Sequence, residues 1–289
     1  MIKEFLKLLR VSHWIKNLFV FVPVLFSKQL FNINYSGEVI LAFISFSIAS
    51  SMVYVFNDLR DEKEDKMHPK KRFRPIASGK ISKTNAVIII VILFALLVAS
   101  VFLFNYKFIV VLFAYIIINA FYTTILRKVV VLDIICIAAG FMLRVMGGAF
   151  VINVYISKWL VLTTLFISLF LAAMKRRSEL VLSIIENNTR KVLSDYSIDF
   201  ANHISSISAA GVIICYALYS VAERTVQYFH TENIVYTTIF VIFGIFRYMF
   251  LAYSKEKGEN TIEILFTDIP MMLNILFYIL SIIGIIYFL

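Results

Sequence analysis

Long apolar runs constrain this chain more than any other feature of its sequence. Of its 289 residues, 61% are hydrophobic and only 16% are charged, whereas a soluble domain carries roughly a quarter charged residues. The apolar residues gather in runs of about 20, the length that an α-helix needs to cross the hydrocarbon core of a bilayer. The sequence therefore predicts an all-α, polytopic membrane protein that forms a single integral membrane domain over residues 1–289.

Nine membrane-spanning helices are expected from these runs. A short amphipathic segment, residues 1–13, precedes them; basic residues surround its apolar side chains, as is typical of a helix that lies on a membrane surface. The apolar face of this segment is expected to contain Ile2, Phe5, Leu6 and Leu9. The nine spans are placed near residues 15–31, 38–57, 85–104, 107–126, 130–152, 157–174, 206–226, 232–253 and 268–288.

Basic residues predict the orientation of the spans. With the N-terminus in the cytoplasm, 22 lysine and arginine residues fall on cytoplasmic segments and four on the outer ends, as the positive-inside rule expects. The long loops at 58–84 and 175–205 then face the cytoplasm, so we expect the active site there, in a multi-pass protein of the inner (plasma) membrane. The net charge of +10 reflects in part topology and anionic lipid headgroups, so no nucleic-acid partner is expected.

The most informative polar stretch follows the second predicted span. If that helix continues past the membrane, Asn57, Asp61 and Asp65 recur at every fourth residue, and Asp58 lies three residues before Asp61. Side chains three and four apart share a helix face, so we expect one acidic ladder that can bind Mg²⁺ together with substrate phosphates. The alternative is a solvated helix extension in which acids and bases alternate for solubility.

A basic segment over residues 68–79 follows the ladder directly. Its lysines and arginines suit phosphate oxygens, and two prolines prevent a regular helix, as expected of a lid over a charged substrate; a role in membrane topology alone is the alternative. Lys16, just inside the first apolar run, is either a phosphate ligand or a side chain that reaches lipid headgroups. Metal-binding acids followed by bases predict a diphosphate site at a membrane surface.

Arg144 lies deep inside the fifth predicted span. An intramembrane arginine is costly and is usually paired or lines a polar cavity. The sequence leaves two interpretations open, a buried structural pair and a wall of the substrate chamber. Gly147 and Gly148, which follow it, are typical of close helix packing.

These motifs resemble those of the UbiA superfamily of intramembrane prenyltransferases. Its first aspartate-rich motif, N-D-x-x-D-x-x-x-D, is present at 57–65, whereas a second such motif is missing and K-R-R-S-E-L stands in its place at 175–180. The branch that the chain resembles most is that of the decaprenyl-phosphate phosphoribosyltransferases. The motifs that match the pattern of this branch lie at 13–17, 57–61, 68–79, 138–144, 175–180 and 258–260.

The resemblance implies transfer of the 5-phosphoribosyl group from phosphoribosyl diphosphate to a polyprenyl phosphate of the decaprenyl type. Pyrophosphate would be released, and the product would serve cell-envelope polysaccharide synthesis. The resemblance also implies Mg²⁺ on Asn57 and Asp61, assisted by Asp58 and Asp65, so that Asp58, Asp61 and Asp65 serve catalysis as metal ligands. The implied donor ligands are Lys16, Tyr54, Lys71, Arg74, Lys175 and Arg176, with Lys128 a weaker one.

Two other functions stay open at this point. A UbiA-type prenyltransferase that attaches a polyprenyl chain to an aromatic acceptor should carry a second acid-rich motif around 175–200, where only Glu179, Glu186, Asp195 and Asp199 are available. A transporter or lipid carrier would leave the acidic ladder without a role. The sequence also leaves open whether the chain forms a homo-oligomer.

Overall fold

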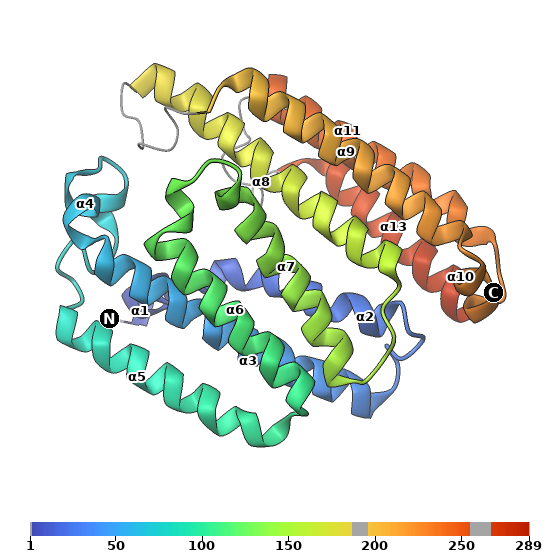
Figure 1. Ribbon diagram of the computed structural model, residues 1–289, viewed down its shortest axis with the longest axis horizontal. Helices are drawn as coiled ribbons and strands as arrows, with labels where there is room; N and C mark the ends of the chain where they lie inside the picture. Colours follow the sequence, from blue (N-terminus) through green and yellow to red (C-terminus); the bar gives the residue numbers. More distant parts are fainter. Residues whose placement is uncertain (1, 187–195, 255–266, 289) are drawn as a thin grey trace. The chain divides into compact units, whose positions relative to one another are not determined.

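The computed structural model describes residues 2–186, 196–254 and 267–288. All regular elements in these residues are helices (Figure 1), which confirms the all-α prediction. The chain divides into two compact units: Met1–Thr124 with Leu143–Tyr155, and Ile125–Met142 with Ile156–Leu289. The longer described helices are α3 (Ile33–Arg60), α5 (Lys83–Ser100), α6 (Tyr106–Thr124), α7 (Leu132–Val151), α8 (Lys158–Glu186), α9 (Ile198–Val221), α11 (Thr238–Ser254) and α13 (Ile269–Phe288).

Eight helices in the described residues are long and apolar enough to cross a membrane, so the predicted count of nine is not confirmed. The difference lies at 15–31, where the chain forms a 3₁₀ helix, η1 (Val11–Phe21), followed by a short α-helix, α2 (Val22–Leu25). Because a 3₁₀ helix rises about 2.0 Å per residue and an α-helix 1.5 Å, the two together extend roughly 28 Å. An extended 3₁₀ segment thus replaces the expected α-helical span.

The N-terminal helix α1 (Ile2–Leu8) is shorter than the predicted segment 1–13. Its Leu8 is completely buried against Val55 and Ile76, whereas Leu6 is 50% exposed. Helix α1 thus packs on the core of the first unit through Leu8, with Phe5 and Leu9 against the same cluster, and the membrane-surface position of its apolar face stays a prediction. This packing fixes the position at which the chain enters η1.

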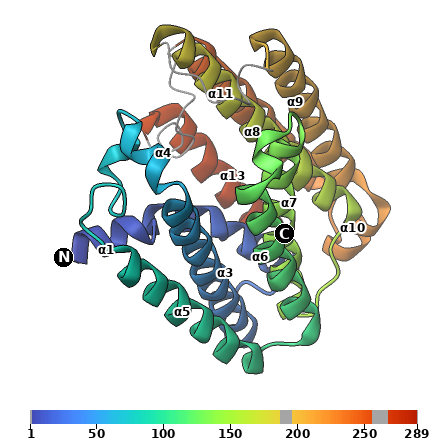
Figure 2. The ribbon, with the colours of Figure 1, turned by 60° about the vertical axis from the view of Figure 1, so that its left-hand side comes forward.

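The core of the first unit forms around α3. Phe46 lies edge-to-face with Phe108 and Tyr115, and α3 packs along α5, as both ribbon views show (Figure 1, Figure 2). On α7, a Cβ added at Gly148 would lie 2.0 Å from the carbonyl oxygen of Val20 on η1. The expectation of close packing at this glycine is confirmed.

The second unit is built on an antiparallel pair, α8 and α9. Phe166 of α8 lies against Gly211 of α9, and Arg177 Nε donates to Asn202 Oδ1 at 2.9 Å, so residue numbers rise along one helix as they fall along the other. Because α8 continues to Glu186, the basic residues at 175–177 lie inside a helix, whereas the sequence placed them in a loop.

The loop predicted at 58–84 is also partly helical. Helix α3 extends to Arg60, and two short helices follow it, α4 (Glu62–Met67) and the 3₁₀ turn η2 (Lys71–Phe73). Irregular segments connect these helices to α5, which begins at Lys83 with Ser82 as its N-cap. The acidic ladder therefore stands at the end of α3 and on α4, whereas Lys71 and Arg72 lie on η2 and Arg74 lies on irregular backbone.

Replacing Gly148 tests the contact between α7 and η1. Gly148→Ala places a methyl group against backbone that cannot move aside, and overpacking of this kind costs about 1–3 kcal/mol, so the thermal unfolding midpoint of the purified protein should fall. Gly284→Ala on α13 is the matched control, since nothing lies within 4 Å of its added Cβ. Equal midpoints for the two variants would contradict the close contact.

Candidate active site

The acidic residues keep helical register across the join between α3 and α4. The Asp61 backbone N–H donates to the Asn57 carbonyl at 2.9 Å, and the Asp65 N–H donates to the Asp61 carbonyl at 2.8 Å. The four-residue spacing therefore places these side chains on successive turns, as the sequence predicts. Asp58, Asp61 and Asp65 are all buried.

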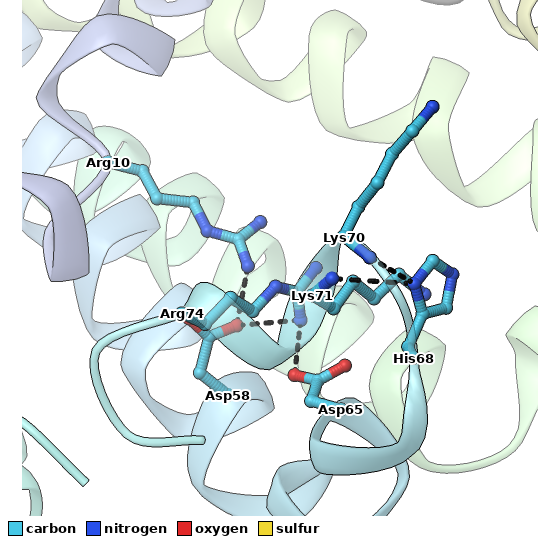
Figure 3. Close-up of polar contacts among 7 residues, drawn as sticks. All are labelled: Arg10, Asp58, Asp65, His68, Lys70, Lys71 and Arg74. Atoms are coloured by element: carbon cyan, nitrogen blue, oxygen red, sulfur yellow. Dashed lines mark hydrogen bonds and ion pairs between the residues drawn. The ribbon is translucent and has the colours of Figure 1, made fainter. Parts of the chain in front are cut away.

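The ladder divides into two pairs of side chains. At about 100° per residue, Asp58 and Asp65 lie about 20° apart around the helix, whereas Asp61 lies about 40° from both Asn57 and Asp65; the contacts of one arginine distinguish the pairs. A single side chain bridges Asp58 and Asp65: Arg74 Nη1 donates to Asp58 Oδ1 at 3.1 Å and to Asp65 Oδ2 at 2.6 Å (Figure 3). The predicted site residues Asp58, Asp65 and Arg74 are thus brought together.

Arg10 joins this cluster from the N-terminal end of the chain. Its Nη2 donates to Asp58 Oδ1 at 2.5 Å (Figure 3), and its guanidinium lies 4.6 Å from the centroid of the Tyr54 ring. Arg10 was not among the site residues predicted from the sequence, in which it is only one of the basic residues of the N-terminal segment. Its position just before the motif at 13–17 is the one signal that could have indicated it.

The other predicted ligands of the first unit surround these residues less tightly. Tyr54 Oη lies 3.4 Å from Nδ1 of His13, a residue of η1. Lys16 is also on η1 and is half-buried. Lys71 is half-buried on η2, and its backbone N–H donates to His68 Nδ1 at 3.4 Å. The Lys70 side chain extends away from the carboxylates (Figure 3).

Arg144 belongs to a buried hydrogen-bond network in the first unit. Its Nε donates to Asn17 Oδ1 at 2.6 Å and its Nη2 to Tyr115 Oη at 2.9 Å, while Asn17 Nδ2 donates to Ser47 Oγ at 3.0 Å. Of the two interpretations left open by the sequence, the structure shows the paired arrangement. The network ties η1 to α3, α6 and α7.

Three predicted phosphate ligands, Lys128, Lys175 and Arg176, belong to the second unit. Arg176 is buried there: its Nε donates to Asp133 Oδ2 at 2.6 Å, and it forms a second ion pair with Glu179. Lys175 is more open, with 45% of its side chain exposed, and Lys128 is exposed. Of these three predicted ligands, the two lysines are therefore more accessible to solvent than Arg176.

Tyr196 completes the polar cluster around Asp133. Its Oη donates to Asp133 Oδ1 at 2.7 Å and accepts from the Val131 backbone N–H at 2.8 Å. Burial, together with the hydrogen bond to the carboxylate, raises the pKa of the Tyr196 hydroxyl, so it stays protonated and keeps donating. The G-E-N motif at 258–260 lies outside the described residues.

Glu62 stands apart from the acidic ladder. Its carboxylate accepts from Lys66 at 2.8 Å and pairs with Lys83 at 2.6 Å. Hydrogen bonds from Lys66 and then Lys83 lower the pKa of this carboxyl. Glu62 therefore serves as a structural link between α4 and the start of α5.

The residues best suited to hold a metal ion are Asn57 and Asp61. They present an amide oxygen and a carboxylate one helical turn apart, and Mg²⁺ is usually bound by one or two carboxylates together with water and substrate phosphates. No group of three or more His, Cys, Asp or Glu side chains able to hold a metal occurs within the described residues. The donor set therefore fits a Mg²⁺ ion that completes its shell with phosphate oxygens.

Comparison with known proteins decides the family. Residues 19–179 match the family model described as the UbiA prenyltransferase family. The chain belongs to this family. A solved structure described as a UbiA homolog from Archaeoglobus fulgidus bound to GPP and Mg²⁺ superposes with a TM-score of 0.73 at 19% identity, covering 98% of this chain and 99% of that one. The UbiA-like fold predicted from the sequence is confirmed.

Curated relatives of this UbiA-family chain carry a more specific name. A decaprenyl-phosphate phosphoribosyltransferase from Mycolicibacterium smegmatis is 33% identical over 226 residues, covering 76% of this chain and 71% of the relative. The protein of the same name from Corynebacterium glutamicum is 33% identical over 219 residues, covering 74% and 66%. A nodulation protein, NoeC, from Azorhizobium caulinodans is 31% identical over 171 residues, covering 59% and 55%.

The network around Arg144 predicts a stability change when one hydroxyl is removed. Tyr115→Phe keeps the ring but deletes the acceptor of the Arg144 hydrogen bond, and the loss of a partner by a buried charged group costs about 1–3 kcal/mol. Tyr106→Phe is the control because its ring is 72% exposed. In the same detergent, the free energy of unfolding of Tyr115→Phe should therefore be lower than that of Tyr106→Phe. Equal values for the two variants would show that Arg144 does not depend on Tyr115.

Proposed function

We propose that this UbiA-family protein transfers the 5-phosphoribosyl group from phosphoribosyl diphosphate to a polyprenyl phosphate and releases pyrophosphate. The observation that carries this proposal is the identity of 33% over 226 residues to a protein named decaprenyl-phosphate phosphoribosyltransferase. The basic sequence at 175–180, in the place of a second acid-rich motif, supports it, because lysine and arginine bind phosphate directly.

In this proposal, Asn57 and Asp61 hold a Mg²⁺ ion. The ion, when bound, neutralises negative charge on the phosphate oxygens of the leaving group. Asp58 and Asp65 support the site, each through its ion pair with Arg74. The likeness to an archaeal homolog solved with Mg²⁺ makes magnesium the metal to test first.

The cationic side chains bind the phosphates of the donor. In the first unit these are Lys16, Lys71 and Arg74, with the hydroxyl of Tyr54 as a further hydrogen-bonding group. In the second unit, the proposed phosphate ligands are Lys128, which is exposed, Lys175, whose side chain is 45% exposed, and Arg176. Preorganised positive charge lowers the barrier because negative charge builds up on pyrophosphate as it departs.

The chemistry needs little beyond positioning and charge. An oxygen of the lipid phosphate attacks C1 of the ribose, the bond from C1 to the pyrophosphate oxygen breaks, and the electron pair leaves with pyrophosphate. The attacking phosphate is already anionic at neutral pH, so no side chain has to remove a proton from it. Attack opposite the leaving group inverts the configuration at C1, and binding both reactants at the membrane surface provides proximity.

The proposed setting follows from the charge distribution of the chain. The active site faces the cytoplasm in the inner (plasma) membrane, where the soluble donor and the phosphate of the lipid can meet. The lipid product would provide an activated pentose for cell-envelope polysaccharide synthesis. A homo-oligomer is compatible with this function but is not required by it.

A labelled-donor assay tests the function directly. Purified protein with Mg²⁺, decaprenyl phosphate and phosphoribosyl diphosphate labelled in the ribose should produce labelled lipid and an equal amount of pyrophosphate. Absence of labelled lipid, together with product formation from a prenyl diphosphate and an aromatic acid, would instead identify a prenyltransferase. Absence of both products would remove the enzymatic proposal.

Asp61 is the acid whose loss should affect turnover most. Asp61→Ala removes a proposed metal ligand and should reduce turnover by at least about 100-fold, because the charge stabilisation that a metal supplies is worth several kcal/mol. Glu64→Ala is the matched control, since Glu64 is an exposed acid of the neighbouring helix α4. Near-normal turnover of a folded Asp61→Ala protein would exclude Asp61 from the metal site.

A further inference from the structure

Two arginines from distant parts of the chain share one carboxylate oxygen. Arg10 Nη2 and Arg74 Nη1 both donate to Oδ1 of Asp58, at 2.5 and 3.1 Å (Figure 3). Arg74 Nη1 also donates to Asp65 Oδ2 at 2.6 Å. The two guanidinium groups are therefore held side by side above the 58/65 pair of acids.

Burial within this cluster is uneven. The carboxylates of Asp58 and Asp65 are only 2% and 4% exposed, whereas the side chains of Arg10 and Arg74 are 19% and 24% exposed. A ligand that approaches from solvent therefore meets the arginines before the carboxylates. Two arginines and two carboxylates also cancel in formal charge, so the guanidinium groups can be held in a partly buried place without an uncompensated charge.

Both arginines keep donors beyond those used in the ion pairs. A guanidinium carries five N–H donors in a planar fork, and the contacts with the acids use Nη2 of Arg10 and Nη1 of Arg74. The fork geometry matches phosphate oxygens. The pair can thus hold the carboxylates and donate to a phosphate group at the same time.

The backbone at Arg10 is held in an uncommon conformation. Its φ and ψ are 49° and 48°, in the left-handed region, which residues other than glycine seldom occupy and which occurs disproportionately at functional sites. This conformation connects α1 to η1 and lies at the point from which the Arg10 side chain reaches Asp58. A left-handed residue commonly ends a helix, and here it turns the chain from α1 into η1 and so places the Arg10 side chain.

We propose that Asp58 is a positioning residue and that Arg10 and Arg74, which it aligns, together bind a phosphate of the diphosphate group. The inference rests on the proposed function only in taking a diphosphate as the ligand. It assigns a role to Arg10, and it separates the acids by function: Asn57 and Asp61 hold the metal, whereas Asp58 and Asp65 hold arginines.

A purely structural role for the same ion pairs is the competing explanation. Arg10 and Arg74 also tie the N-terminal segment and the 68–79 segment to α3. The chain offers a matched control for this role, because Lys80 pairs with Glu4 at 2.7 Å and so links α1 to the same part of the chain without contacting the acidic ladder. Lys80→Gln removes that link and leaves the arginines in place.

The test measures two affinities on the purified full-length protein. Binding of Mn²⁺ alone is followed by electron paramagnetic resonance, and binding of inorganic pyrophosphate at a fixed Mn²⁺ concentration is followed by calorimetry. Arg10→Met should weaken pyrophosphate binding about 10- to 100-fold, in keeping with the strength of charge-assisted hydrogen bonds. Arg10→Lys, which keeps the charge but not the fork, should fall between Arg10→Met and the unmodified protein.

The Asp58 variant separates positioning from metal binding. Asp58→Asn should weaken pyrophosphate binding about 10-fold and leave Mn²⁺ affinity within about twofold, whereas Asp61→Ala should lower Mn²⁺ affinity itself. Lys80→Gln should change neither affinity. Loss of Mn²⁺ affinity in Asp58→Asn equal to that in Asp61→Ala would overturn the proposal, as would unchanged pyrophosphate binding in Arg10→Met.

The Arg10→Lys variant and the pyrophosphate probe each remove one ambiguity from this test. Arg10→Lys retains the positive charge, so it provides the affinity measurement if Arg10→Met fails to fold, and pyrophosphate affinity in Arg10→Lys equal to that of the unmodified protein would then overturn the proposal. Pyrophosphate also reports on the arginines whatever the donor is. Arg10-dependent pyrophosphate binding in a protein that makes no labelled lipid would reject the phosphoribosyl donor and leave the role of the arginines standing.

Discussion

Pairing of buried charge at the end of α3 is the constraint on which the N-terminal part of this protein depends. Asp58 is 2% exposed, and leaving a buried carboxylate without a partner costs about 3–5 kcal/mol. Its partners come from the two sides of the sequence, Arg10 from before α3 and Arg74 from after it. The packing of Leu8 against Val55 and Ile76 places α1 where Arg10 can reach the carboxylate.

Two arginines within membrane-spanning helices of the described residues are also paired. Arg144 donates to Asn17 and Tyr115. Arg247 of α11 donates to both carboxylate oxygens of Asp268, at 3.0 and 2.8 Å. Because polar groups are expensive in the membrane, each of these side chains has partners within its own unit. The polar network around Arg144 joins η1, α6 and α7 to α3, the helix that carries Asn57 and Asp58.

The sequence predicted features that depend on local periodicity, and it failed where distant residues meet. The four-residue spacing of Asn57, Asp61 and Asp65 was enough to predict their helical register, and the apolar runs predicted eight of the spans. The 3₁₀ form of Val11–Phe21 was not predictable from hydropathy, which does not distinguish the two helix types. Arg10 was missed because its partner lies 48 residues away, and the ion pair of Arg176 with Asp133 joins residues 43 apart, which no local pattern reveals.

The central claim is that one helix end separates two tasks, metal binding at Asn57 and Asp61 and alignment of phosphate-binding arginines at Asp58 and Asp65. A cryo-EM structure of the full-length protein with Mg²⁺ and phosphoribosyl diphosphate tests this most directly. The account predicts a metal at about 2.1 Å from oxygens of Asn57 and Asp61, with Arg10 and Arg74 donating to the diphosphate while still bonded to Asp58. A metal coordinated by Asp58, or a diphosphate bound away from both arginines, would contradict it.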